Sequence, residues 1–135
     1  MSASFTGGCV CGAIRYEVTG KPIMMFNCHC RDCQRTTGSG FTPVVYVPAK
    51  AFKITKGSPR YYSTPSEMVA HNKRGFCPEC GSTVHYSGGN FPDVIAIPLG
   101  ALDDPYIVDS PDFSVWERRR HDWLEIIDED VEHSD

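Results

Sequence analysis

The cysteines are the feature that most constrains this chain. Seven cysteines occur in three tight groups, all before residue 81: Cys9-Val10-Cys11, Cys28-His29-Cys30-Arg31-Asp32-Cys33 and Cys77-Pro78-Glu79-Cys80. Cysteines one or two residues apart are well placed to ligate one metal ion together, as in the knuckles of structural zinc sites. An odd number does not suit a disulfide framework, and the N-terminus lacks the basic start and apolar stretch of a secretory signal. The cysteines are therefore predicted to be metal ligands in a cytoplasmic protein, where thiols stay reduced.

The number of cysteines predicts two sites of different kinds. Four thiolates saturate zinc and make a structural site, whereas three leave a position open to water, an exogenous ligand or a substrate. Spacing alone leaves two partitions open. In one, a zinc ribbon forms from Cys30, Cys33, Cys77 and Cys80. In the other, the four ligands are Cys9, Cys11, Cys77 and Cys80, which leaves a compact trio of Cys28, Cys30 and Cys33.

The apolar pattern predicts a mainly β chain. Residues 10–18 alternate, with Ile14, Tyr16 and Val18 on one face. Further strands are expected at residues 41–47, 52–55, 60–63, 69–72, 82–87 and 94–99. Pro43 and Pro48 favour an edge or short strand for residues 41–47. The sustained 3.6-residue period of a long amphipathic helix is not found, and short helical turns are expected only at residues 32–37 and 112–119.

Length and charge limit the domain number and the partners. The chain has 135 residues, which suits one domain, expected at residues 1–124. Residues 125–135 carry six acidic residues and no Lys or Arg, and are expected to be a flexible acidic tail. The net charge of -4 argues against general nucleic-acid binding, and apolar runs fall short of the roughly 18 to 20 residues of a membrane span. Neither nucleic acid nor membrane is expected as a partner, and the sequence carries no sign of the oligomeric state.

Three motifs resemble those of the glutathione-dependent formaldehyde-activating enzyme (GFA) family, which includes centromere protein V. They are Gly8-Cys9-Val10-Cys11-Gly12-Ala13-Ile14-Arg15-Tyr16, Cys28-His29-Cys30-Arg31-Asp32-Cys33-Gln34-Arg35-Thr36-Thr37-Gly38-Ser39 and Arg74-Gly75-Phe76-Cys77-Pro78-Glu79-Cys80-Gly81-Ser82. The resemblance implies a mainly β, Mss4-like (β-tent) zinc-binding fold with short helical turns. It also implies the second partition, with a structural zinc on Cys9, Cys11, Cys77 and Cys80 and a second, open zinc on Cys28, Cys30 and Cys33.

The resemblance further implies a carbon–sulfur lyase that joins glutathione to formaldehyde and gives S-hydroxymethylglutathione. Zinc with three thiolates carries a net charge of about -1, so it is a weaker Lewis acid than zinc held by neutral histidines. Such a site suits binding and deprotonating a thiol that then adds to an aldehyde. The expected substrate is therefore an adduct of glutathione, or another small thiol, with formaldehyde or a related aldehyde. Late in the chain, Ser114-Val115-Trp116 and Asp122-Trp123 replace a His-Ile-Trp-like stretch and a Pro-Trp that family members often show, a departure that concerns the substrate more than the fold.

Several side chains beside the cysteines bear on this function. Arg31 and Arg35 are the candidates to bind the two carboxylates of glutathione. His29 could instead close the second site as a fourth ligand, although adjacent residues on an extended chain point apart. Asp32 is expected to cap the short helix.

Two alternative functions stay open on the sequence. One is a thiol-binding or carrier module without catalysis, and the other is a structural zinc scaffold. A methionine sulfoxide reductase, which shares the broad fold, is disfavoured because that enzyme needs a nucleophilic cysteine late in the chain and none follows Cys80.

Overall fold

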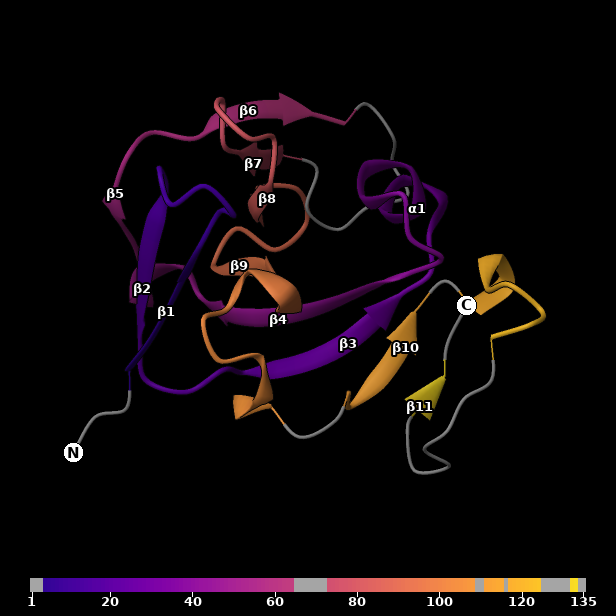
Figure 1. The fold of residues 1–135 in the computed structure, drawn as a ribbon. Coiled ribbons are helices and arrows are strands. Elements are labelled where there is room, and N and C mark those ends of the chain that lie inside the picture. The colour runs from indigo at the N-terminus through magenta and orange to yellow at the C-terminus, as the bar shows by residue number, and fades with distance from the viewer. Residues whose placement is uncertain (1–3, 65–72, 109–110, 116, 125–131, 134–135) are drawn as a thin grey trace.

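The computed structural model describes residues 4–64, 73–108, 111–115, 117–124 and 132–133 (Figure 1). Two sheets account for most of them. The smaller sheet has the strand order β1-β2-β5, with β1 at Ser4–Gly8, β2 at Arg15–Thr19 and β5 at Phe52–Lys56. The larger sheet has eight strands in the order β11-β10-β3-β4-β9-β8-β7-β6.

The strands of the larger sheet are mostly short and antiparallel, with the exception of β10, which pairs in parallel with β3 and β11. Their bounds are β3 Met24–Cys28, β4 Thr42–Pro48, β6 Arg60–Ser63, β7 Lys73–Phe76, β8 Thr83–Ser87, β9 Val94–Pro98, β10 Phe113–Val115 and β11 Glu132–His133. One α-helix, α1 (Arg31–Thr37), lies among the described residues, and 3-10 helices occur at Ala49–Ala51, Leu99–Ala101, Pro105–Ile107 and Glu117–Arg119. The expected mainly β architecture is confirmed. None of the helices described is long and apolar enough to span a membrane.

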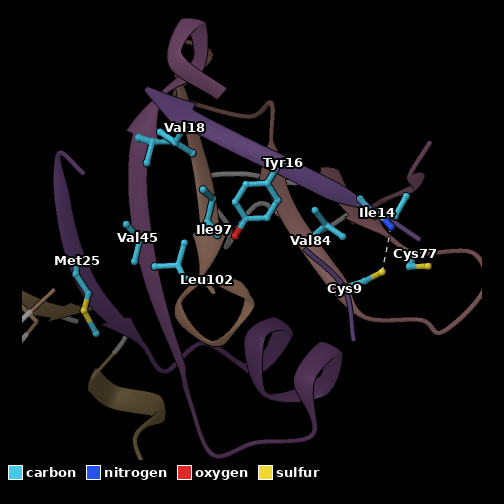
Figure 2. Close-up of a cluster of buried hydrophobic side chains, with 11 residues drawn as sticks. Cys9, Ile14, Tyr16, Val18, Met25, Val45, Cys77, Val84, Ile97 and Leu102 are labelled. Atoms are coloured by element: carbon cyan, nitrogen blue, oxygen red, sulfur yellow. Dashed lines mark hydrogen bonds between the residues drawn. The ribbon is translucent and has the colours of Figure 1, made fainter. Parts of the chain in front are cut away.

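The main hydrophobic core lies between the two sheets. Ile14, Tyr16 and Val18 are each at most 1% exposed, so the alternation predicted for residues 10–18 is confirmed. Figure 2 shows the Tyr16 ring pointing toward Ile97 and Leu102, which belong to the same buried cluster. Burial of each large apolar side chain contributes about 1.5–3 kcal/mol.

Strand β4 is an inner strand of the larger sheet and has seven residues, so the prediction of an edge or short strand for residues 41–47 was wrong. β4 pairs with β3 on one side and with β9 on the other. Pro43 and Pro48 occupy the second and the last position of the strand. The N–H groups that proline removes are therefore lost at the two ends, and the residues between keep theirs.

The prediction of a helical turn at residues 112–119 was wrong for its first half. Phe113–Val115 forms β10, and only Glu117–Arg119 is helical. The reason is a pair of hydrogen bonds that hold this segment beside β3: the Met25 N–H donates to Asp112 Oδ2 (3.0 Å), and the Asp112 N–H donates to the Met25 carbonyl (2.7 Å).

Other expected strands have mixed outcomes. Strands β5 and β6 follow one another as predicted but belong to different sheets. The strand expected at residues 69–72 lies outside the described residues, and β7 begins directly after it. In the acidic tail, Glu132–His133 pairs with β10, while residues 125–131 and 134–135 are outside the described part. The single domain at residues 1–124 and the flexible tail stay predictions.

Candidate metal centres and the cavity beside them

The structure brings the cysteines together in two sets. One set contains Cys9, Cys11, Cys77 and Cys80, and the other contains Cys28, Cys30 and Cys33. Within each set all sulfur atoms lie within 4.8 Å of one another. The alternative zinc ribbon would need Cys77 and Cys80 to lie beside Cys30 and Cys33. The structure does not bring these two pairs together.

The four-cysteine set has distances that suit zinc. The Sγ atoms of Cys9 and Cys11 are 3.6 Å apart, and those of Cys11 and Cys77 are 3.7 Å apart. A tetrahedral zinc with Zn–S bonds of about 2.3 Å requires sulfurs about 3.8 Å apart. Because Cys9 and Cys11 follow β1 of the smaller sheet and Cys77 and Cys80 connect β7 to β8 of the larger one, a metal ion here would join the two sheets.

The backbone around this set is folded as two knuckles. The Ile14 N–H donates to Cys9 Sγ (3.2 Å; dashed in Figure 2), and the Glu79 N–H points at Cys77 Sγ (3.4 Å). Gly81 closes the second knuckle at φ +80°, a conformation that favours glycine, and donates to the Cys77 carbonyl at 2.8 Å. Such N–H donors stabilise thiolates and so favour metal binding.

The trio wraps around the junction between a strand and a helix. Cys28 ends β3, and Cys30 is the N-cap of α1, where its sulfur accepts the Cys33 N–H at 3.2 Å. The prediction that Asp32 caps this helix was wrong, because Asp32 already lies in the first turn and the cysteine sulfur takes the capping position.

The trio needs a cation to ionise fully. Hydrogen bonds from the Cys28 and Cys33 side chains lower the pKa of Cys30 to about 3. The neighbouring Cys30 in turn raises the pKa of Cys28 to about 12, and Cys28 and Cys30 raise the pKa of Cys33. The three thiols therefore do not ionise independently, because the thiolate of Cys30 disfavours ionisation of Cys28 and Cys33. A divalent cation is what lets three adjacent thiolates coexist, so this donor set also fits zinc.

A cavity of about 460 Å³ lies beside the trio, on the face of the larger sheet opposite the main hydrophobic core. Alternate residues of its strands line it, among them Phe26 and Cys28 of β3 and Tyr46 of β4. Helix α1 adds Asp32 and Cys33. Two cysteines of the trio thus open onto the cavity, whereas its described lining includes no cysteine of the four-cysteine set.

Comparisons with known proteins agree with this arrangement. A profile of the family described as "Glutathione-dependent formaldehyde-activating enzyme" matches residues 4–119. This chain belongs to the GFA family. Its fold is therefore the Mss4-like fold of that family, as the sequence predicted.

Two relatives of the GFA chain illustrate the likeness. A Halomonas elongata protein, provisionally named a glutathione-dependent formaldehyde-activating enzyme, is 23% identical over 124 residues, which cover 89% of this chain and 79% of that protein. A crystal structure of a Rhodobacter sphaeroides protein has a TM-score of 0.59 at 20% identity, covering 73% of this chain and 87% of that one. The second comparison supports the fold alone.

The structure places His29 of this GFA chain away from the trio's ligand set. His29 is 2% exposed, its ring stacks on Phe41 with 5.5 Å between centroids, and its Nε2 lies 3.5 Å from Ser114 Oγ. Its nitrogens are not among the ligand atoms that gather with the three sulfurs. The closed Cys3His site that the sequence left open is therefore not formed.

Arg31 and Arg35 lie on α1 and are exposed, and neither lines the cavity. The Arg31 side chain donates a hydrogen bond from Nη1 to Gln34 Oε1 on the same helix. Their role in binding a substrate stays a prediction.

Among the described residues that line the cavity the cation is Arg74 of β7, which the sequence alone did not single out. Arg74 is the first residue of the third motif, and that position was the signal in the sequence that could have marked it as a binding residue. What the sequence lacked was the strand register that places this arginine in the cavity lining.

Proposed function

We propose that this GFA chain is a zinc-dependent enzyme of the carbon–sulfur lyase type. Its substrate would be the adduct of glutathione, or another small thiol, with formaldehyde or a related aldehyde. The observation that carries the proposal is the contrast between the two cysteine sets. The trio opens through Cys28 and Cys33 onto a cavity of about 460 Å³, whereas the four-cysteine set does not.

The four-cysteine set has the structural role in this proposal. Cys9, Cys11, Cys77 and Cys80 would hold a zinc whose ligands are all protein sulfurs. Such a site has no position for a substrate, and its binding energy becomes folding energy. The ion would hold the β1–β2 hairpin to the β7–β8 turn.

The trio has the catalytic role. Cys28, Cys30 and Cys33 would hold the second zinc, which when bound lowers the pKa of an incoming thiol and fixes its sulfur. The overall reaction forms one carbon–sulfur bond, converts the aldehyde C=O into C–OH and moves the thiol proton to that oxygen. Phe26 and Tyr46 contribute an apolar wall, which would limit the access of water to the reacting atoms.

Arg31 and Arg35 are retained in the proposal as binding residues for ligand carboxylates that extend past α1. Their exposure supports contact with the part of a ligand that protrudes from the cavity. Arginine suits this role because its guanidinium binds a carboxylate through two parallel hydrogen bonds.

The test compares exchange rates in the zinc-loaded protein. Equilibrium exchange between ¹³C-formaldehyde and its adducts with glutathione and with other small thiols is followed by NMR, and the uncatalysed rates are subtracted. We expect the wild type to accelerate exchange and Cys33→Ser to return it to the uncatalysed rate. Native mass spectrometry then shows two zinc ions in the wild type and one in the variant.

Two outcomes would contradict the proposal. Thiol binding without acceleration would favour a carrier module. A single zinc in the wild type, with no thiol bound, would favour a structural scaffold.

A further inference from the structure

The register of the larger sheet places four cavity residues in one row. Tyr46 of β4 pairs with Ala96 of β9, Ala96 pairs with Tyr86 of β8, and Tyr86 pairs with Arg74 of β7. Directly paired residues of neighbouring strands project from the same face of a sheet. All four line the cavity, so the row crosses the sheet from Tyr46, which pairs with Met24 at the start of β3, to Arg74.

The walls of the cavity are largely aromatic. Phe26 and Tyr46 meet edge to face with 4.9 Å between ring centroids, and Phe91 lies 6.4 Å from Tyr46. Tyr86 adds a further ring. Rings in these arrangements receive another aromatic ring well, because edge-to-face and offset packing are both favourable.

Charged groups are few in this cavity. Among the described lining residues, Arg74 and Asp32 are the ones with ionisable side chains other than cysteine and tyrosine. Glutathione carries two carboxylates and an ammonium group, each of which loses its hydration on entering an apolar site. Within the described lining Arg74 can pair with one carboxylate and Asp32 with the ammonium group, so the second carboxylate has no cation inside the cavity.

Arg74 lines the cavity, where its guanidinium can donate hydrogen bonds to a ligand. One guanidinium nitrogen, Nη1, donates to Thr83 Oγ1 at 3.3 Å, and the guanidinium carbon lies 5.1 Å from the Phe76 ring centroid. The Nε atom is buried and has no hydrogen-bond partner. Because protein atoms cover Nε, a ligand carboxylate would bind the guanidinium through its terminal nitrogens.

We propose that the thiol bound in this cavity has an aromatic body and a single carboxylate held by Arg74, so that glutathione is a poor ligand. The inference rests on the proposed function, because it assumes that the ligand sulfur lies at the trio. It specifies the substrate class for that same site.

The test uses the protein with cobalt(II) in both cysteine sets. The visible absorption of cobalt–thiolate centres responds when a further thiol binds, and a site already holding four thiolates has no position for one. Three thiols are titrated: 2-mercapto-3-phenylpropanoate, its primary amide and glutathione. The acid is expected to bind at least about tenfold more tightly than glutathione, because binding transfers its phenyl ring from water into the apolar cavity.

The contribution of Arg74 is measured separately. In the wild type the acid is expected to bind about tenfold more tightly than the amide, through the charge-assisted hydrogen bond. Arg74→Met should abolish that difference, because it lowers the affinity for the acid more than the affinity for the amide. Arg60→Met, on the exposed strand β6 and outside the cavity lining, is the matched control and should keep the difference.

The outcomes separate the two proposals. Glutathione binding as tightly as the phenyl acid overturns the inference and leaves the proposed function standing. Equal affinity of acid and amide in the wild type removes the role of Arg74, and this comparison does not depend on any variant. If no thiol changes the cobalt spectrum, the proposed function fails and the inference fails with it.

Discussion

The Ser82 hydroxyl lies 3.2 Å from Cys80 Sγ and 3.3 Å from the backbone nitrogen of Val10, which donates to it. Ser82 therefore connects the two cysteine knuckles, one from each sheet. Hydrogen bonds from Ser82 lower the pKa of Cys80 to about 5. The serine has the position of a residue that orients a metal ligand without binding the metal.

Replacing Ser82 by alanine should weaken zinc binding at the four-cysteine set. Loss of a hydrogen bond to a ligand typically reduces metal affinity by about tenfold or more. The measurement is competition with a coloured chelator, with Ser63→Ala, on exposed strand β6, as the control. Equal zinc affinity in Ser82→Ala and the wild type would show that the hydroxyl has no such role.

The two cysteine sets should respond differently to single substitutions. Cys80→Ser is expected to lower the melting temperature by about 10 °C or more, because an ion bound at this set would join the two sheets and the variant would lose it. Cys33→Ser is expected to change it by much less, since the trio lies within one strand–helix junction. Thermal unfolding of both zinc-loaded variants provides the comparison, and similar melting temperatures would refute the division of roles.

Acid should destabilise the fold through His85. Its ring stacks on Phe52 (4.8 Å between centroids), Tyr61 Oη is 3.3 Å from its Nε2, and burial together with Lys73 lowers its pKa to about 4. Between about pH 6.5 and pH 4 the unfolded chain binds a proton that the folded chain does not. The free energy of unfolding therefore falls with decreasing pH, by at most about 1.4 kcal/mol per pH unit.

The measurement is urea unfolding of the wild type and His85→Gln at pH 7.5 and pH 5.5. The variant should lose less stability than the wild type between the two values. The comparison between variants separates this effect from acid release of metal, which both share. Parallel pH dependences would exclude His85 as the source.

The hydroxyl of Tyr16 should be dispensable. Tyr16 is fully buried, and its oxygen has no hydrogen-bond partner. Tyr16→Phe is therefore expected to keep or raise the free energy of unfolding, by up to about 1 kcal/mol. The control is Tyr61→Phe, which loses a contact with His85 and should not be stabilising. A clear loss of stability in Tyr16→Phe would contradict the expectation.

The sequence predicted well where the signal was local. The alternation of Ile14, Tyr16 and Val18 reflects one buried face of β2, and the helix after Cys30 was placed to within one residue. The cysteine partition was different, because spacing within each group says nothing about which groups meet. The contact of Cys11 with Cys77 spans 66 positions and depends on how the two sheets pack, so the resemblance to the family was needed to predict it.

The errors share a physical cause, which is that register and strand order are long-range properties. The prolines of β4 indicated an edge, although they stand near the strand ends and its centre is paired on both sides. Residues 113–115 form a strand because β3 lies beside them. Arg74 reaches the cavity because it pairs with Tyr86, and nothing within the short strand β7 specifies that partner.

The sequence separation of the two cysteine sets imposes an order on metal acquisition. Cys28 to Cys33 is a six-residue segment, so its ligands stay close together even before the sheets have formed. The other set is drawn from both ends of a span from Cys9 to Cys80, and closing so long a loop carries a greater entropic cost. During synthesis the trio is thus complete while half of the four-cysteine set has yet to be made, so a metal ion that unites the sheets could bind only afterwards.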